Sequence, residues 1–196
     1  MAQKELEAIQ GISLLLFARK LSEAGKVAGM LIPYQTSISF DPQRDSDSTP
    51  TKSGSITTSS TVSTDLEVEF VNNFSKIADQ FQDSLFDGDK MEFWLINRQR
   101  QNAEGKYWAT YMRGTVSEDE WDGDPDDVAN RDVSFAIDGT PKRGWTTLPA
   151  EAQEQIDYVF RGLGVVTSAK NDGTDGGGKA WDPSDTGLAD DQVVAG

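Results

Sequence analysis

The segment Asp65-Leu66-Glu67-Val68-Glu69-Phe70 alternates acidic and apolar residues at every step. Successive side chains of a β-strand point to opposite faces of a sheet, so the segment predicts a strand with one buried face and one acidic face. The core is expected to receive Leu66, Val68 and Phe70. The acidic residues, Asp65, Glu67 and Glu69, repel one another on the opposite face. That face must therefore be well hydrated, as on an ordinary sheet surface, or serve a purpose.

Further strands are predicted on both sides of this segment. Apolar or alternating runs occupy residues 12–19 and 30–40 before it, and residues 91–96, 106–116 and 132–137 after it. Residues 21–29 are expected to connect the first two strands. Within residues 30–40, Ile38 and Phe40 share one face, while Ser37 and Ser39 share the other. Trp94 and Trp108 lie within the later strands and are expected in the core.

Two helices are also predicted. The first covers residues 74–86, with Asn72 or Asn73 as its cap and Asp87-Gly88 as its end. Its apolar residues recur at helical spacing: Phe74, Ile77, Ala78, Phe81 and Leu85. The second covers residues 149–161, with Pro149 in its first turn and Gly162 after its end. Sandwich-type strands with one or two covering helices predict a β-rich α+β domain.

Several polar segments are expected to lie outside the core. Residues 41–55 hold two prolines and a glycine among Asp, Ser and Thr, and 13 of the 19 residues from 46 to 64 are Ser or Thr. This composition predicts a long mobile loop that leads into a polar strand. Residues 117–132 predict an acidic, hydrated loop. An N-terminal arm at residues 1–11 and a flexible, Gly/Asp-rich C-terminal extension at residues 165–196 flank a domain at residues 12–164.

The composition excludes several classes of function. The sequence has 18 Lys+Arg against 33 Asp+Glu, a formal charge of −15, and neither His nor Cys. Disulfides, thiolate nucleophiles, Ser-His-Asp triads and the usual His/Cys zinc sites are therefore excluded. Binding to the phosphate backbone of nucleic acids requires Lys and Arg in a basic stripe, which is absent. The apolar run at residues 12–18 is too short to cross a bilayer, so no membrane partner is expected.

Other patterns are weak. Residues 173–179 fit a phosphate-binding loop, but Ala180 and Pro183 follow where a hydroxyl residue and a helix are needed. Asp122, Asp124 and Asp126 imitate part of a calcium loop that lacks its turn glycine and bidentate Glu. Any pair of the many carboxylates chosen as a catalytic acid and base would be arbitrary, and the tryptophans are scattered. No catalytic residue, metal or cofactor is expected.

The order of segments resembles that of the major tail proteins, or tail tube proteins, of long-tailed non-contractile bacteriophages of Gram-positive bacteria. The resemblance covers roughly residues 10–162. It begins at GISLLLFARK (residues 11–20) and continues at TKSGSI (51–56), where Ser53 stands in place of the expected Asp. It is strongest through KYWATYMRG (106–114), FAIDGTP (135–141), GWTTL (144–148) and IDYVFR (156–161).

The resemblance implies a tail-tube-type β-sandwich with a flanking helix that forms hexameric rings stacked into a hollow tube. It implies that residues 41–55 contact the neighbouring ring; the candidate residues are Asp41, Arg44, Asp45, Asp47, Thr51, Lys52, Ser53 and Gly54. The implied partners are other copies of the chain, the tape measure protein in the lumen, and the tail terminator and distal tail proteins. Genomic DNA would pass through without specific binding. The implied location is the virion, with assembly in the host cytoplasm.

A structural role in DNA ejection is therefore the first hypothesis, with Asp65, Glu67 and Glu69 facing the lumen. Those side chains could equally point outward. The alternative function is a β-sandwich module of a phage or cell surface that binds carbohydrate or protein through its loops.

Overall fold

The computed structural model describes residues 8–149, 152, 162–165 and 175–179, and the structural statements below concern these residues. The chain divides into two compact units, Met1–Thr147 and Leu148–Gly196. The first unit holds the elements described here. The predicted helix at residues 149–161, most of the arm at residues 1–11 and most of the extension at residues 165–196 lie outside the described residues. No helix among those described is long and apolar enough to span a membrane.

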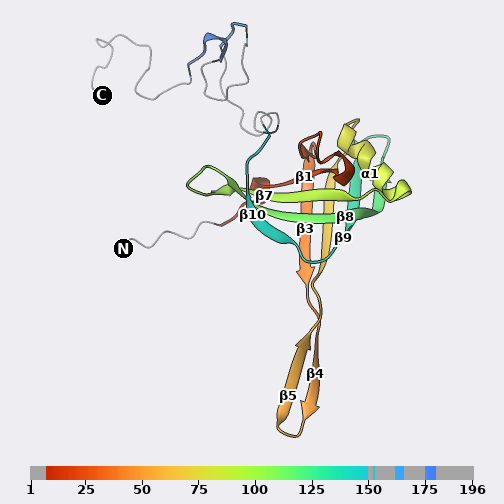
Figure 1. Ribbon diagram of the computed structural model, residues 1–196. Coiled ribbons are helices and arrows are strands. Elements are labelled where there is room, and N and C mark those ends of the chain that lie inside the picture. Colours follow the sequence, from red (N-terminus) through yellow and green to blue (C-terminus); the bar gives the residue numbers. More distant parts are fainter. Residues whose placement is uncertain (1–7, 150–151, 153–161, 166–174, 180–196) are drawn as a thin grey trace, which may run out of the picture. The chain divides into compact units, whose positions relative to one another are not determined.

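The first unit is built on one antiparallel sheet with the spatial order β2-β1-β7-β8-β9-β6-β3 (Figure 1). Its strands are β1 (Leu14–Lys20), β2 (Met30–Leu31), β3 (Gln35–Gln43), β6 (Ser63–Val71), β7 (Met91–Gln101), β8 (Tyr107–Asp122), β9 (Asn130–Ile137) and β10 (Lys142–Thr146), which pairs with the first part of β8. Short 3-10 turns, Gly11–Ser13 and Leu21–Glu23, flank β1. The predicted strands are present, but the second is divided by Pro33-Tyr34, and β10 was not predicted.

Strand β8 joins the two halves of the sheet. One half contains β2, β1, β7, β10 and the first part of β8, and the other contains the second part of β8 with β9, β6 and β3. Gly114 pairs with Met91 of β7 and also with Ile137 of β9, so β8 changes partner at this residue. A side chain at Gly114 would collide with the carbonyl oxygen of Ala136. Glycine therefore permits the close approach of β8 and β9 that lets the two halves face each other. Figure 1 shows the resulting arrangement, in which β7 and β8 run across β3.

The hydrophobic core fills the space between the halves. Leu16, Phe93 and Met112 come from one half, and the alternating residues Leu66, Val68 and Phe70 come from the other. Gln35 links β3 to β1, because its amide accepts a hydrogen bond from Leu16 N at 2.9 Å and donates one to Leu16 O at 2.8 Å. The β-rich sandwich predicted from the sequence is confirmed.

Helix α1 (Lys76–Asp87) packs on this core. Ile77, Ala78 and Phe81 are buried, and the Phe81 ring lies 5.3 Å from that of Phe135. The predicted start was wrong: Ser75 is the cap, and Phe74 is fully exposed. The Asn73 side chain instead bonds Ser75 N and Val71 O, so it shapes the turn before the helix.

The predicted loop at residues 117–132 was also wrong. β8 continues to Asp122 and β9 begins at Asn130, which leaves a short loop between them. The strand is possible because Asp119, which points inward, forms a bidentate ion pair with Arg131, with N–O distances of 2.7 and 2.6 Å. Arg131 Nη2 also donates to Ala78 O of α1 at 3.0 Å. Both charged side chains are buried.

Candidate functional site

The outward side of β3, β6, β9 and the second half of β8 is a continuous acidic face. The register places Glu69 between Ser37 and Asp132, and Asp132 beside Glu120. The next row on this side runs through Ser39, Glu67, Ser134 and Glu118. The acidic members of this face are Asp41, Asp65, Glu67, Glu69, Glu118, Glu120, Asp122 and Asp132. Within these described strands, no Lys or Arg points to the same side.

The predicted side-chain directions in β6 are therefore confirmed, and the structure adds acidic neighbours to them. Glu118 and Glu120 were missed because their segment was interpreted as a loop. Asp132, the first residue of the strand predicted at residues 132–137, was missed because the register that brings it beside Glu69 was unknown. The signal that could have identified them is an alternation of direction, because Glu118 and Glu120 point outward while Asp119 between them points inward. This alternation is hard to recognise in the sequence, because Arg131, the partner of Asp119, is distant along the chain.

Crowding on the acidic face perturbs Glu67. A hydrogen bond to Asp132 and the charge of Asp132 raise the pKa of Glu67, with smaller contributions from burial and from Glu118 and Glu69. A shared proton between two carboxyl groups is the expected response to like charges at close range. The acidic neighbours therefore disfavour the ionised form of Glu67.

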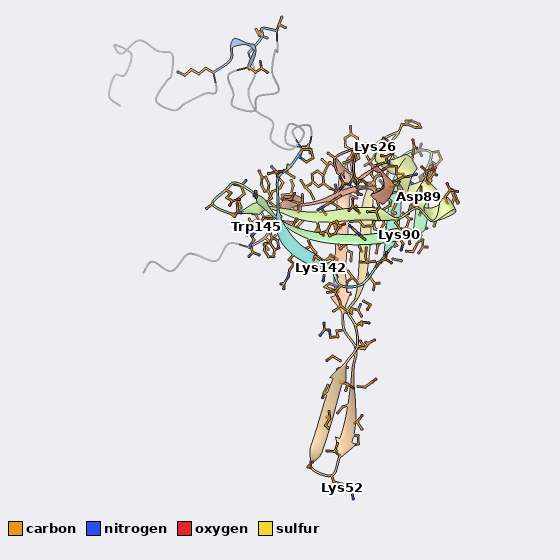
Figure 2. All side chains as sticks on the ribbon, viewed as in Figure 1. Lys26, Lys52, Asp89, Lys90, Lys142 and Trp145 are labelled. Carbon is orange, nitrogen blue, oxygen red and sulfur yellow. The ribbon has the colours of Figure 1, made fainter. Side chains whose placement is uncertain are left out.

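Strands β3 and β6 lead directly into a two-stranded ribbon formed by β4 (Ser46–Thr51) and β5 (Gly54–Ser59) (Figure 1). The bond from Ser60 N to Asp45 O, 2.8 Å long, joins the ribbon to the β3–β6 ladder. Every residue from 46 to 59 is exposed. Lys52 lies at the tip (Figure 2), where the Thr51 hydroxyl donates to Gly54 O at 2.7 Å.

The mobile loop predicted at residues 41–55 is thus wrong as a secondary structure. The β-branched Thr and Ile residues favour an extended ribbon, in which Thr49 pairs with Ile56 and Asp47 with Thr58. Of the predicted inter-ring residues, Asp41 belongs to β3 and to the acidic face. Arg44 and Asp45 lie at the base of the ribbon; Asp47, Thr51, Lys52, Ser53 and Gly54 lie in its strands and turn.

The half of the sheet that bears the acidic face has two open edges. β3 is the last strand of the sheet, and β8 beyond Gly114 has no strand partner on the side that β7 occupied. An open pocket of about 460 Å³ lies beside the start of β3, between Leu14 and Leu15 of β1 and Gln35–Ile38. On the β8 edge, Trp121 is 54% exposed. Exposed strand edges can pair with another chain.

The tryptophans differ from the prediction. Trp94 is half-buried on the side of β7 away from the core, where its ring lies 5.5 Å from that of Tyr111. Trp108 is also half-buried, and it packs 5.2 Å from Trp145 of β10 instead of joining the core. Two tryptophans that are far apart in sequence therefore form a cluster, with the Arg100 guanidinium 3.9 Å above the Trp108 ring.

The described residues contain no group of three or more carboxylates placed to hold a metal ion. The segment at residues 173–179, which was not expected to bind phosphate, lies partly outside the described residues.

No protein-family model and no curated protein matches the chain. Solved structures do match. The SPP1 tail tube, determined by solid-state NMR and cryo-EM, is 14% identical with a TM-score of 0.62, over 82% of this chain and 91% of that one. The tail of an empty gene transfer agent particle with C6 symmetry is 17% identical with a TM-score of 0.52, over 71% of this chain and 100% of that one. The virion of a native gene transfer agent particle is 14% identical with a TM-score of 0.53, over 70% of this chain and 99% of that one.

Proposed function

We propose that this chain, which has the fold of a tail tube subunit, is a structural virion protein that forms hexameric rings stacked into a hollow tube for DNA. The observation that carries the proposal is the acidic face, because it lies on β3 and β6, the same strands that extend into the ribbon. One pair of strands thus offers both a wall for the bore and an arm toward the next ring.

The two open edges support ring closure. Strand directions alternate from β8 through β9 and β6 to β3. The β8 edge of a neighbouring copy, placed beside β3, would continue the same antiparallel order. Such a contact joins two different surfaces of one chain, so it closes into a ring when the rotation per copy fits. The C6 symmetry of the gene transfer agent tail supports six copies. The halves of the sheet that bear the acidic face would then join around the ring into one barrel.

The ribbon supports stacking of one ring on the next. An isolated two-stranded ribbon without buried side chains is only marginally stable in water. The next ring would supply the missing surface, with Arg44 and Lys52 available for its acidic groups. Because the isolated ribbon is only marginally stable, part of the entropy cost of ordering it would arise at assembly, so free subunits need not polymerise at once. The charge of −15 favours solubility of the free subunit.

The acidic face would line the bore in this arrangement. Repeated around the ring, Asp65, Glu67, Glu69 and their neighbours make a negative wall that repels DNA phosphates. Salt screens this repulsion over about 8 Å at physiological ionic strength. DNA would therefore slide without a bound state from which it must escape.

The same proposal includes the expected partners. The tape measure protein would occupy the bore before ejection, and the tail terminator and distal tail proteins would bind the two ends. The finished location would be the phage tail, after assembly in the host cytoplasm. No catalytic role is proposed.

Electron microscopy of the purified chain at high concentration tests the function. Tubes, or rings of uniform diameter, are expected. Monomers that persist at every concentration, together with affinity for a glycan or protein, would overturn the proposal in favour of the binding module.

A further inference from the structure

Two exposed corners of opposite charge lie at the two ends of β7. The basic corner contains Arg100, Trp108, Arg143 and Trp145, and the acidic corner contains Phe86 and Asp87 at the end of α1. We propose that the basic corner of each copy binds the acidic corner of the next copy in the ring. This contact rests on the proposed function, and it involves surfaces that lie outside the open strand edges.

The basic corner is an ordered platform. Arg100 lies 3.9 Å above Trp108 and 5.7 Å from the Trp145 ring, and the two indole rings are 5.2 Å apart. Arg143 lies two residues before Trp145 on β10, so both side chains share one face. Trp145 is 41% exposed. Stacking holds the guanidinium plane of Arg100 in place, while its N–H donors stay available to a carboxylate.

The charges near this platform among the described residues do not neutralise it. Glu104, in the turn between β7 and β8, pairs with Lys106 at 2.7 Å. Lys142 also lies on β10 but points to the opposite face, in register with Tyr111. The corner therefore presents positive charge around an exposed aromatic ring.

The acidic corner lies at the C-terminal end of α1, a position that favours a nearby cation, but the last turn of this helix supplies none. The last turn of α1 contains no basic residue, and it ends with Asp87 before Gly88 in the left-handed conformation. Carbonyl groups at a helix C-terminus carry partial negative charge, so an aspartate there is unfavourable and a nearby cation is favourable. Lys20 already binds Asp83 and Asp89, each at 2.7 Å. Asp87 has no ion-pair partner within the described part of the chain.

An exposed aromatic ring lies beside the Asp87 carboxylate. Phe86 is 78% exposed beside Asp87. The acidic corner thus offers a carboxylate and an apolar ring, and the basic corner offers guanidinium groups and indole rings. Aromatic residues and Arg are enriched at protein interfaces, and complementary charges across an interface select the partner and fix its register.

The placement suits a head-to-tail ring. α1 ends just before Met91, and Arg100 is next to the last residue of β7, so the corners are separated by about 30 Å, the length of such a strand. Figure 2 shows Asp89 and Trp145 at opposite ends of the sheet. A copy can therefore present one corner to each neighbour, but it cannot join its own two corners.

Charge reversal tests the pairing. Arg100→Glu and Asp87→Lys should each raise the protein concentration needed for ring or tube formation by about five- to tenfold, equivalent to roughly one charged contact. The double variant Arg100→Glu/Asp87→Lys should restore assembly, because every interface then carries the exchanged charges. Thermal unfolding of the unassembled subunit should be nearly unchanged in all three. Lys142→Glu, a reversal on the opposite face of β10, is the matched control and should assemble normally.

The outcomes separate this contact from the function. If the wild type forms no ring or tube, the proposed function fails. If the wild type assembles and both single reversals assemble equally well, only the corner contact fails. Loss in both single variants without rescue in the double variant also overturns the pairing, as does an equal loss from Lys142→Glu.

Discussion

The buried ion pair between Asp119 and Arg131 allows a quantitative prediction. Replacing Arg131 with Met removes the two bonds to Asp119 and the bond to Ala78 O, which are 2.7, 2.6 and 3.0 Å long. It also leaves the Asp119 carboxylate, only 3% exposed, without its counter-charge. Breaking a buried pair in this way typically costs about 3–5 kcal/mol, a large share of the stability of an ordinary domain. We therefore expect Arg131→Met to lower the free energy of unfolding by about that amount.

Urea unfolding of the unassembled subunit, followed by tryptophan fluorescence, measures the loss. Trp121 is a local reporter, because Arg131 lies 4.9 Å from its ring. The exposed pair of Lys90 and Asp138, with an N–O distance of 2.6 Å and exposures of 47% and 54%, provides the control. Lys90→Met should change stability by less than about 1 kcal/mol. The double variant Arg131→Met/Asp119→Leu should regain stability relative to Arg131→Met, because no charge remains buried alone. If Arg131→Met were no more destabilising than Lys90→Met, the reasoning would be refuted.

Three further predictions concern the acidic face and the ribbon. The folded state holds the Glu67 proton more tightly than the unfolded chain, whose pKa is near 4.5, so the destabilisation from Glu67 is absent below that pH and grows as pH rises through the raised pKa. Glu67→Gln should therefore unfold at a higher temperature than wild type at pH 7 and at a similar temperature at pH 4; the opposite order at pH 7 would contradict this. Combined replacement of Asp65, Glu67 and Glu69 by Lys should slow DNA ejection from virions while tubes still form, and unchanged ejection kinetics would argue against a lumenal role. Replacement of residues 46–59 by a tight turn should leave subunit stability nearly unchanged, because all of them are exposed, but it should yield rings without tubes in electron micrographs; normal tubes would exclude the ribbon from stacking.

Local patterns predicted the parts of the fold in which a residue's neighbours in sequence determine its environment. The strict alternation at residues 65–70 placed Leu66, Val68 and Phe70 in the core correctly. The apolar spacing of α1 identified Ile77 and Phe81 in the same way. The exact start of α1 was less predictable, because Asn73 and Ser75 are both good capping residues and only their contacts distinguish them.

Parts that depend on distant partners could not be predicted in this way. Asp119 can lie inside a strand only because Arg131 reaches it across β8 and β9. The acidic face emerges from register, since Glu120 and Asp132 come beside Glu69 only through pairing of strands separated along the chain. The ribbon has a polar composition typical of a mobile loop, and the pairing of its two strands together with its β-branched residues makes it extended.

The close approach of Gly114 to Ala136 would have a consequence for the width of the proposed channel. The two halves of the sheet meet at this point, so in the proposed ring the local backbone geometry would contribute to the angle that each subunit spans. Six wedges close a circle when each turns by about 60°, and seven do so at about 51°. A difference of about 9° at one crossing would therefore favour a wider ring with one additional subunit.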